Sequence, residues 1–358
     1  MIRSSNALVA KALRTPERIP QDAAGWEALI GRTREAGLIA TLAARIDASI
    51  GLDRVPAAPR AHLIAARHRC RAQQAAVRRE TAEIARALAP LRAPVVLLKG
   101  AAYLMAALPP AEGRLFSDID ILVPKSHLPD VESALMLAGF ATTHLHPYDQ
   151  RYYRRWMHEL PPMQHVKRLT ILDVHHTIVP ETAGVALDAS ALFRSATPLA
   201  DAPPFSVLSP CDMVLHSATH LFQNEELTHG LRDLVDIDRL LAHFAAANPS
   251  FWRALVARAG ELDLGRPLFY ALRFTTRLLG TPIPDAIAPD VARLAPAAPV
   301  GALMDRLLDA ALQPKSASAA TRWARRALYL RGHWLKMPAP LLAYHLTWKA
   351  LRRDEEPA

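Results

Sequence analysis

Cysteine is scarce in this chain of 358 residues, which contains only Cys70 and Cys211. The two residues lie far apart in the sequence, and neither has the spacing of a metal-binding motif. Two cysteines also cannot build the disulfide framework of a small secreted domain. We therefore expect two free thiols in a reducing compartment.

Long apolar runs are missing as well. No segment reaches the roughly 20 apolar residues that a membrane-spanning helix requires. The first twenty residues, MIRSSNALVAKALRTPERIP, lack the long apolar core of a secretory signal. From these absences we expect a cytoplasmic protein.

Aromatic residues make up only 6% of the chain, whereas alanine, leucine and arginine dominate it. This composition favours helices over an all-β architecture. The apolar fraction of 51% excludes disorder by composition, and the length allows more than one domain. A formal net charge of +9 suits a polyanionic partner such as a nucleotide, RNA or an anionic lipid headgroup. An arginine-rich composition could equally reflect a GC-rich genome.

Helical periodicity marks the two ends of the chain. It runs through residues 22–90, most clearly from Pro59 to Ala89, and Pro90 should end that helix. Helices are expected again at 210–223, 230–246, 250–260 and 266–279. The proline-rich stretch 280–300 should wrap the surface.

The middle of the chain has strand character. Short apolar runs predict strands at 95–98, 117–123, 140–145 and 169–175, with helices after Lys99-Gly100 and at 126–138. Residues 146–168 are interpreted as a hairpin or loop over a site. We expect an α+β protein with four parts: a helical region (1–90), an α/β core (91–200), a helical domain (201–312) and a basic aromatic tail (313–358).

Asp118 and Asp120 form the most informative motif. Alternate residues of a strand face the same way, so both carboxylates should project together, about 6–7 Å apart. They would repel each other unless a cation lay between them, and Mg²⁺ prefers carboxylate and phosphate oxygens. On spacing alone, the alternative is a surface strand with two solvated acids. The buried-looking run IDILV argues against it, because acids at its entrance need compensation.

Asp173 offers a third carboxylate, at the end of another apolar run, LTILDVHH. An acid on an adjacent strand would complete a site that neutralises a triphosphate and activates an attacking hydroxyl. The alternative is a strand-end aspartate that caps a turn. Alternation places Asp173 and His175 on one face of this strand.

Lys99-Gly100 opens a helix directly after a strand. Free amides at a helix N-terminus bind anions, and glycine lets a phosphate approach the backbone. Lys99 could neutralise an outer phosphate, but the same turn is also common without a ligand. Arg114 could bind a phosphate or a carboxylate, or be a plain surface arginine.

Weaker signals lie further along the chain. His216 and His220 share a helix face, and packing is favoured over metal binding because no third ligand is evident. Arg232 and Asp236 have the spacing of a helical ion pair, and with Asp233 they could alternatively face the cleft.

The tail interleaves basic residues with Trp323, Tyr329, Trp334 and Trp348. Such a segment could contact an anionic membrane or nucleic acid, although terminal helices packed on the domain are favoured. Pro338 and Pro340 should break it into two pieces.

The segment LLKGAAYLMAALPPAEGRLFSDIDILV resembles the uncharacterised nucleotidyltransferase family of the polymerase-β-like nucleotidyltransferase superfamily. That family pairs a Lys-Gly turn with a downstream Arg-x-x-x-Asp-x-Asp strand. LDVHH is similar to its third-carboxylate strand, and HSATHLF and LRDLVDI are similar to its helical continuation. The resemblance covers roughly residues 90–245.

The resemblance implies a polymerase-β-like core, a small mixed sheet with helices, flanked by helical regions. It implies Asp118, Asp120 and Asp173 as catalytic residues and magnesium ligands, in a site for two metal ions. It places Lys99, Gly100 and Arg114 near the triphosphate, and we assign Ser117 to the same nucleotide site. The chain departs from the wider superfamily in having Lys99-Gly100 where Gly-Gly or Gly-Ser is usual.

The leading hypothesis is therefore a magnesium-dependent transfer of a nucleoside monophosphate from an NTP, such as ATP, to an acceptor, with release of pyrophosphate. The acceptor could be a small molecule, a protein or RNA. The alternatives are an inactive nucleotide- or partner-binding protein of the same fold, and a membrane-surface biosynthetic accessory protein recruited by the basic tail.

Overall fold

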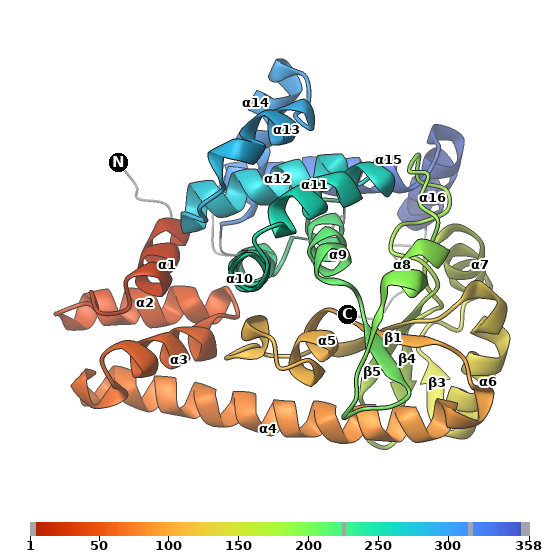
Figure 1. The fold of residues 1–358 in the computed structure, drawn as a ribbon, viewed down its shortest axis with the longest axis horizontal. Coiled ribbons are helices and arrows are strands. Elements are labelled where there is room, and N and C mark those ends of the chain that lie inside the picture. Colours follow the sequence, from red (N-terminus) through yellow and green to blue (C-terminus); the bar gives the residue numbers. More distant parts are fainter. Residues whose placement is uncertain (1–4, 224–226, 314–317, 352–358) are drawn as a thin grey trace.

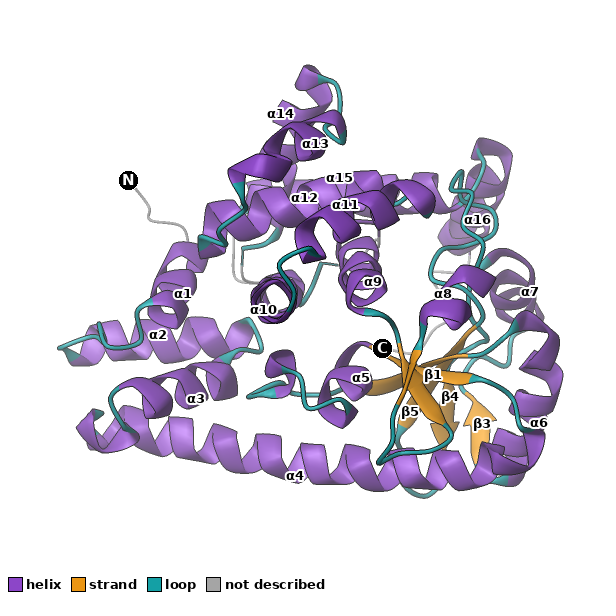
Figure 2. Ribbon diagram, viewed as in Figure 1, coloured by secondary structure: helices purple, strands orange, loops and turns teal. Residues whose placement is uncertain are grey.

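The described residues form sixteen α-helices and one seven-stranded mixed sheet (Figures 1 and 2). A computed structural model describes residues 5–223, 227–313 and 318–351. The strands gather in one part of the molecule, and helices pack around them (Figure 2). The fold is mixed α+β, which confirms the expected class.

The N-terminal region is helical, as predicted. Its helices are α1 (Ser5–Arg14), α2 (Ala23–Glu35), α3 (Ile39–Ser49) and α4 (Ala57–Leu88). The 32-residue α4 runs the length of the molecule beneath α3, α5 and the sheet (Figure 1). Its buried face repeats at helical spacing, through Leu63, Ala66, Cys70, Val77 and Ile84.

The sheet has the strand order β3-β4-β5-β2-β1-β7-β6. Its central strands are β1 (Val95–Leu98), β2 (Asp118–Leu122) and β5 (Ile171–His175). β1 is buried at all four positions because both faces of the sheet are covered. β2 runs antiparallel to β1 and parallel to β5, and the register places Asp120 beside Asp173.

The remaining strands and the short helices around the sheet complete the core. The strands are β3 (Phe140–Thr142), β4 (Met163–His165), β6 (Thr197–Pro198) and β7 (Phe205–Val207). The helices are α5 (Lys99–Met105), α6 (Leu128–Leu137), α7 (Pro147–Trp156) and α8 (Ser190–Ser195). Expected strand 140–145 is shorter than predicted, and β6 and β7 were not predicted.

The interpretation of 146–168 as a hairpin or loop is wrong, because the stretch contains α7 and β4. His146 caps α7 by accepting a hydrogen bond from the Tyr148 amide. The helix is held by aromatic packing against the far end of the chain, where Tyr148 stacks on Trp348 with ring centroids 3.7 Å apart. The sequence pattern of the ten residues of α7 could not predict this contact with a distant segment of the chain.

The C-terminal half is helical, with α9 (Pro210–Gln223), α10 (Gly230–Ala247), α11 (Phe251–Glu261) and α12 (Gly265–Phe274) close to the expected bounds. Residues 280–300, expected to wrap the surface, are mostly exposed or half-buried, and they contain α13 (Ala288–Arg293) and the start of α14 (Ala298–Ala311). None of the described helices is long and apolar enough to cross a membrane.

The tail forms α15 (Ala319–Lys336) and α16 (Ala339–Leu351), with the break at the position that Pro338 predicts. Some side chains of α15 are buried and others are exposed. Leu328 and His333 are buried, whereas Trp323 and Trp334 are exposed. Residues 314–317 and 352–358 of the expected tail, and residues 1–4 of the N-terminal region, lie outside the described residues.

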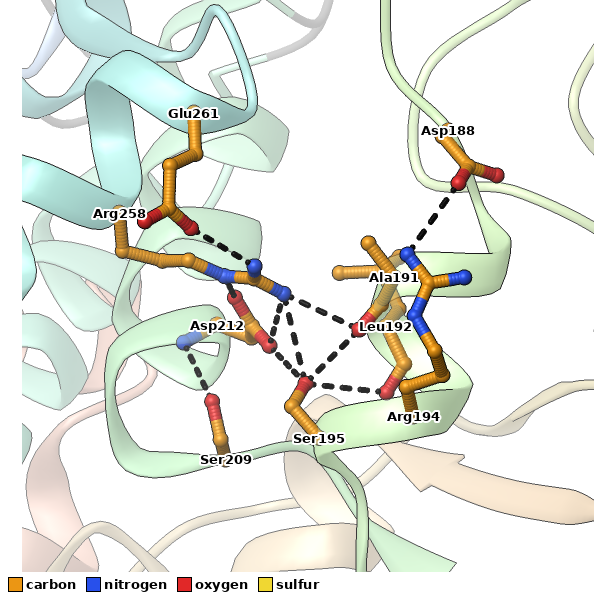
Figure 3. Close-up of polar contacts among 9 residues, drawn as sticks. All are labelled: Asp188, Ala191, Leu192, Arg194, Ser195, Ser209, Asp212, Arg258 and Glu261. Atoms are coloured by element: carbon orange, nitrogen blue, oxygen red, sulfur yellow. Dashed lines mark hydrogen bonds and ion pairs between the residues drawn. The ribbon is translucent and has the colours of Figure 1, made fainter.

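A cluster of polar contacts joins α8, α9 and α11 (Figure 3). Asp212, in the first turn of α9, is fully buried and accepts hydrogen bonds from Arg258 Nε at 2.7 Å and Ser195 Oγ at 2.5 Å. Arg258 also donates to the Ala191 carbonyl. These contacts fix the first turn of α9 relative to α8 and α11.

Candidate active site

Three carboxylates lie on one face of the sheet. Asp118 and Asp120 are alternate residues of β2, and Asp173 lies beside Asp120 on β5. Residues opposite each other in neighbouring strands face the same way. Asp120 is 2% exposed, while Asp118 and Asp173 are half-buried at the open side of the group.

The three acids have different electrostatic surroundings. Asp120 Oδ1 accepts hydrogen bonds from Lys99 Nζ at 2.7 Å and from His175 Nε2 at 3.0 Å. Burial disfavours its charge, yet these two partners hold the pKa of Asp120 well below its ordinary value. Burial and the neighbouring Asp120 charge raise the pKa of Asp118, and they raise the pKa of Asp173 to about 8.

The donor set of this group fits a hard divalent cation. Asp173 Oδ1 is buried and has no hydrogen-bond partner among the described residues. Burial, and after it the charges of Asp120 and Glu159, raises the pKa of Asp173, so a bound cation would favour its ionised form. Carboxylate oxygens are the ligands that Mg²⁺ prefers.

Lys99 lies where β1 passes into α5, with a backbone φ of 46°. The pairing of Leu98 with Asp120 brings the Lys99 side chain onto the Asp120 carboxylate. Burial lowers the pKa of Lys99, but Asp120 and Asp118 outweigh that effect and raise it overall. The ammonium group therefore lies on an acid of the site.

Gly100 allows α5 to lie close to the segment before β2. A Cβ at this position would be 2.9 Å from Phe116 Cδ1 and 3.0 Å from Arg114 Nε. Arg114 is 8% exposed, so the alternative of a surface arginine is wrong. Its Nη1 binds Asp236, while its Nε is buried without a partner among the described residues and lies against Gly100.

Ser117 is exposed at the entrance to β2 and donates a hydrogen bond to Asp118 Oδ1 at 2.9 Å. It also lines a pocket of about 440 Å³ between α2, α4 and α10. We call this the basic pocket; its lining includes Arg34, His62, Arg69, His229 and Arg232, and no acid among the described residues. A pocket of this charge next to Asp118 is suited to an anionic ligand.

The predicted pair of Arg232 and Asp236 is not formed. Arg232 instead binds Asp233 at 2.8 Å, and Asp236 binds Arg114 from the segment before β2. Arg232 and Asp236 have the expected helical spacing, but the Asp236 carboxylate pairs with the buried guanidinium of Arg114, which comes from outside the helix. Through Asp236, α10 holds Arg114 in place beside α5.

His216 and His220 lie on one face of α9, as expected, and line a small cavity of about 30 Å³ with Lys99, His158 and His175. Burial and the Lys99 charge hold the pKa values of both well below the ordinary histidine value. Neither belongs to a group of metal ligands in the described part of the chain.

Sequence reasoning missed His158 and Glu159 and named His175 without a role. Glu159 and His175 are partners in an antiparallel β-bridge of the backbone. Glu159 Oε2 is 3.2 Å from His175 Nδ1. The alternation that placed His175 on the face of Asp173 was a usable signal. Nothing in the sequence around Glu159 indicates its neighbours, because the contact depends on where the chain returns to β5.

Comparison with known proteins adds one finding. No curated protein and no solved structure matches the chain. The family described as "Uncharacterised nucleotidyltransferase" matches residues 22–280, a range that includes the three carboxylates, the Lys99-Gly100 turn and the basic pocket. The chain therefore belongs to this nucleotidyltransferase family.

Proposed function

We propose that the protein is a magnesium-dependent enzyme that transfers a nucleoside monophosphate from an NTP to an acceptor and releases pyrophosphate. The observation that carries this proposal is the placement of Asp118, Asp120 and Asp173 on one face of β2 and β5. Burial and the Asp120 charge raise the pKa values of Asp118 and Asp173, so a cation bound by the carboxylates would offset an unfavourable arrangement. Family membership supports nucleotidyl transfer in general.

Asp118, Asp120 and Asp173 would hold the metal, and the hypothesis requires two ions at this site. Bound magnesium supplies charge neutralisation at the triphosphate and at the attacking oxygen. Lys99 and His175 keep Asp120 ionised and oriented through their hydrogen bonds. Asp173 Oδ1 would accept the proton of the acceptor hydroxyl, because it has no other partner among the described residues.

The basic pocket would bind the anionic part of a substrate. It adjoins Asp118 through Ser117, and its volume of about 440 Å³ is within the usual range for small-ligand sites. Arg114 would contribute to anion binding through its Nε, which has no hydrogen-bond partner among the described residues and lies beside Gly100 at the start of α5.

Two other parts of the hypothesis remain proposals. The retained carboxylates favour catalysis over a binding protein of the same fold, since nucleotide binding alone does not need three clustered acids.

Exposed Trp323 and Trp334 on the arginine-rich α15 favour peripheral contact with an anionic membrane or nucleic acid, which vesicle flotation and RNA binding would test. We also propose the cytoplasm as the location and 90, 200 and 312 as approximate domain boundaries.

The test is a transfer assay with purified protein, Mg²⁺ and each of the four NTPs labelled at the α-phosphate. We expect magnesium-dependent release of pyrophosphate and label on an acceptor or on the protein. Asp118→Asn removes one ligand charge, so it should weaken magnesium-dependent nucleotide binding without loss of the fold. Asp188→Asn, at an exposed acid, is the matched control. Unchanged magnesium-dependent nucleotide binding in Asp118→Asn would contradict the assignment.

A further inference from the structure

Three potential metal ligands lie beside the carboxylates without being part of them. His158, Glu159 and His175 each place one ligand atom within 4.8 Å of the others. His175 Nδ1 is 3.2 Å from Glu159 Oε2, and His158 Nε2 is 3.9 Å from the same oxygen. Metal–ligand distances of about 2.0–2.2 Å separate two nitrogen or oxygen ligands of one ion by about 3.0–3.5 Å. The first pair already has this separation.

The backbone holds these ligands together. Glu159 and His175 are antiparallel bridge partners. On either side of the bridge, the Leu160 amide donates to the Val174 carbonyl at 2.8 Å, and the His176 amide donates to the His158 carbonyl at 2.9 Å. The site is therefore fixed by main-chain hydrogen bonds that do not depend on an ion.

The hydrogen bonds of His175 define which nitrogen is free. Its Nε2 is 3.0 Å from Asp120 Oδ1, and a carboxylate oxygen can only accept, so Nε2 carries the hydrogen. In the neutral ring, Nδ1 then directs a lone pair at the Glu159 carboxylate. Nδ1 and Glu159 Oε2, 3.2 Å apart, need either a proton or a metal ion between them, and a carboxylate–histidine–metal chain is a common arrangement around bound metals.

The surroundings leave room for a further ligand. The cavity beside His158 and His175 measures about 30 Å³, and a single water needs roughly 10–15 Å³. His158 Nδ1 is buried and has no hydrogen-bond partner among the described residues. One water could therefore complete the coordination of an ion held by the three side chains.

We propose that His158, Glu159 and His175 bind a divalent transition metal of the zinc class. Two imidazole nitrogens and one carboxylate suit zinc, whereas magnesium prefers oxygen ligands alone. The ion would hold the segment around Glu159 against β5 and, through His175, fix the orientation of Asp120. This inference concerns a second site and does not depend on nucleotidyl transfer.

The experiment is a Zn²⁺ titration of the full chain after removal of metals with a chelator, followed by calorimetry in the presence of millimolar Mg²⁺. We expect one tight equivalent of zinc. Glu159→Gln and His158→Gln should each weaken binding by more than about a hundredfold, since even outer partners of a metal contribute 10–100-fold. His243→Gln, at an exposed histidine of α10, should bind zinc as the wild type does.

Each of the following results would overturn the proposal. If wild type binds no zinc tightly, or if the ligand variants bind as wild type does, His175 is an imidazolium that pairs with Asp120 and Glu159. If Asp118→Asn lowers zinc affinity as much as His158→Gln does, the ion occupies the carboxylates instead. Should a variant fail to fold by circular dichroism, the visible spectrum of the Co²⁺-loaded wild type decides: a spectrum of octahedral, oxygen-only coordination contradicts the site.

Discussion

Asp120 and Asp173 lie side by side on neighbouring strands, yet their surroundings shift their proton affinities in opposite directions. Lys99 and His175 keep the pKa of Asp120 low, whereas burial and the Asp120 charge raise the pKa of Asp173 to about 8. Paired acids with separated pKa values commonly divide binding and proton transfer between them. At the residue scale, this difference supports the proposed roles of Asp120 as a metal ligand and of Asp173 as both a metal ligand and a proton acceptor.

Asp173→Asn should weaken NTP binding less than Asp118→Asn does and should abolish turnover, because the amide cannot accept the acceptor proton. Calorimetric titration with NTP and a pyrophosphate-release assay measure the two properties separately. The exposed acid Asp188 provides the control, as Asp188→Asn. A loss of turnover below about tenfold, or roughly 1.4 kcal/mol of barrier, would mean that Asp173 is structural.

Lys99→Met tests whether the ammonium group competes with the metal for Asp120. Removal of a positive charge 2.7 Å from Oδ1 should strengthen Mg²⁺ binding by at least about threefold, or ~0.7 kcal/mol. Affinities for NTP and NMP measured in the same titrations separate this role from triphosphate binding. A weaker NTP affinity with unchanged NMP affinity would show that Lys99 contacts the outer phosphates instead.

At the scale of elements, local pattern was sufficient where burial follows a simple period. The strands that carry Asp118, Asp120 and Asp173 are short apolar runs, and their alternation correctly placed Asp118 beside Asp120. The long helix α4 also followed from its period. These elements are defined by which face is buried, and that information is contained in neighbouring residues.

Other elements depend on contacts between distant segments, so the sequence did not predict them. β7 exists because it pairs in parallel with β1, more than a hundred residues earlier. α7 depends on α16, and the Arg114–Asp236 pair joins the loop before β2 to α10. The sequence also did not predict that Lys99 pairs with Asp120, because this contact follows from the register of β1 with β2.

The contacts of Asp212 predict a stability effect at this scale. Asp212→Ala would leave the Arg258 guanidinium without the carboxylate that accepts from its Nε and Nη2, and would remove a partner of Ser195 (Figure 3). Loss of one partner of a buried pair typically costs 3–5 kcal/mol. Arg258 is one-fifth exposed and also binds Glu261, so we expect a smaller loss, about 2–3 kcal/mol.

Urea unfolding of Asp212→Ala and wild type measures this difference. Asp188→Ala is the matched control, because Asp188 pairs with Arg194 in the same region but is exposed (Figure 3). Its unfolding midpoint should be nearly unchanged. Equal effects of the two substitutions would contradict the view that burial of Asp212 makes its contacts important.

At the scale of the whole molecule, the N-terminal helices contribute directly to the candidate site. The basic pocket lies between α2, α4 and α10, and it reaches Asp118 through Ser117. Arg69, on the 32-residue α4, has no ion pair among the described residues. The N-terminal helical region therefore supplies charge to a site whose carboxylates come from the sheet.

Arg69→Glu should weaken NTP binding by roughly tenfold to a hundredfold, because loss of a hydrogen bond to a charged group costs about 1.5–3 kcal/mol. Arg79→Glu changes an exposed arginine of the same helix outside the pocket, so it controls for net charge and helix propensity. Titrations at low and high salt separate a direct contact from general attraction, since screening weakens long-range effects of both substitutions. A direct contact predicts a difference between the variants that persists in high salt. If the two variants weaken NTP binding equally and salt removes both effects, the basic pocket is not where the triphosphate binds, and the carboxylate site must take its substrate from another direction.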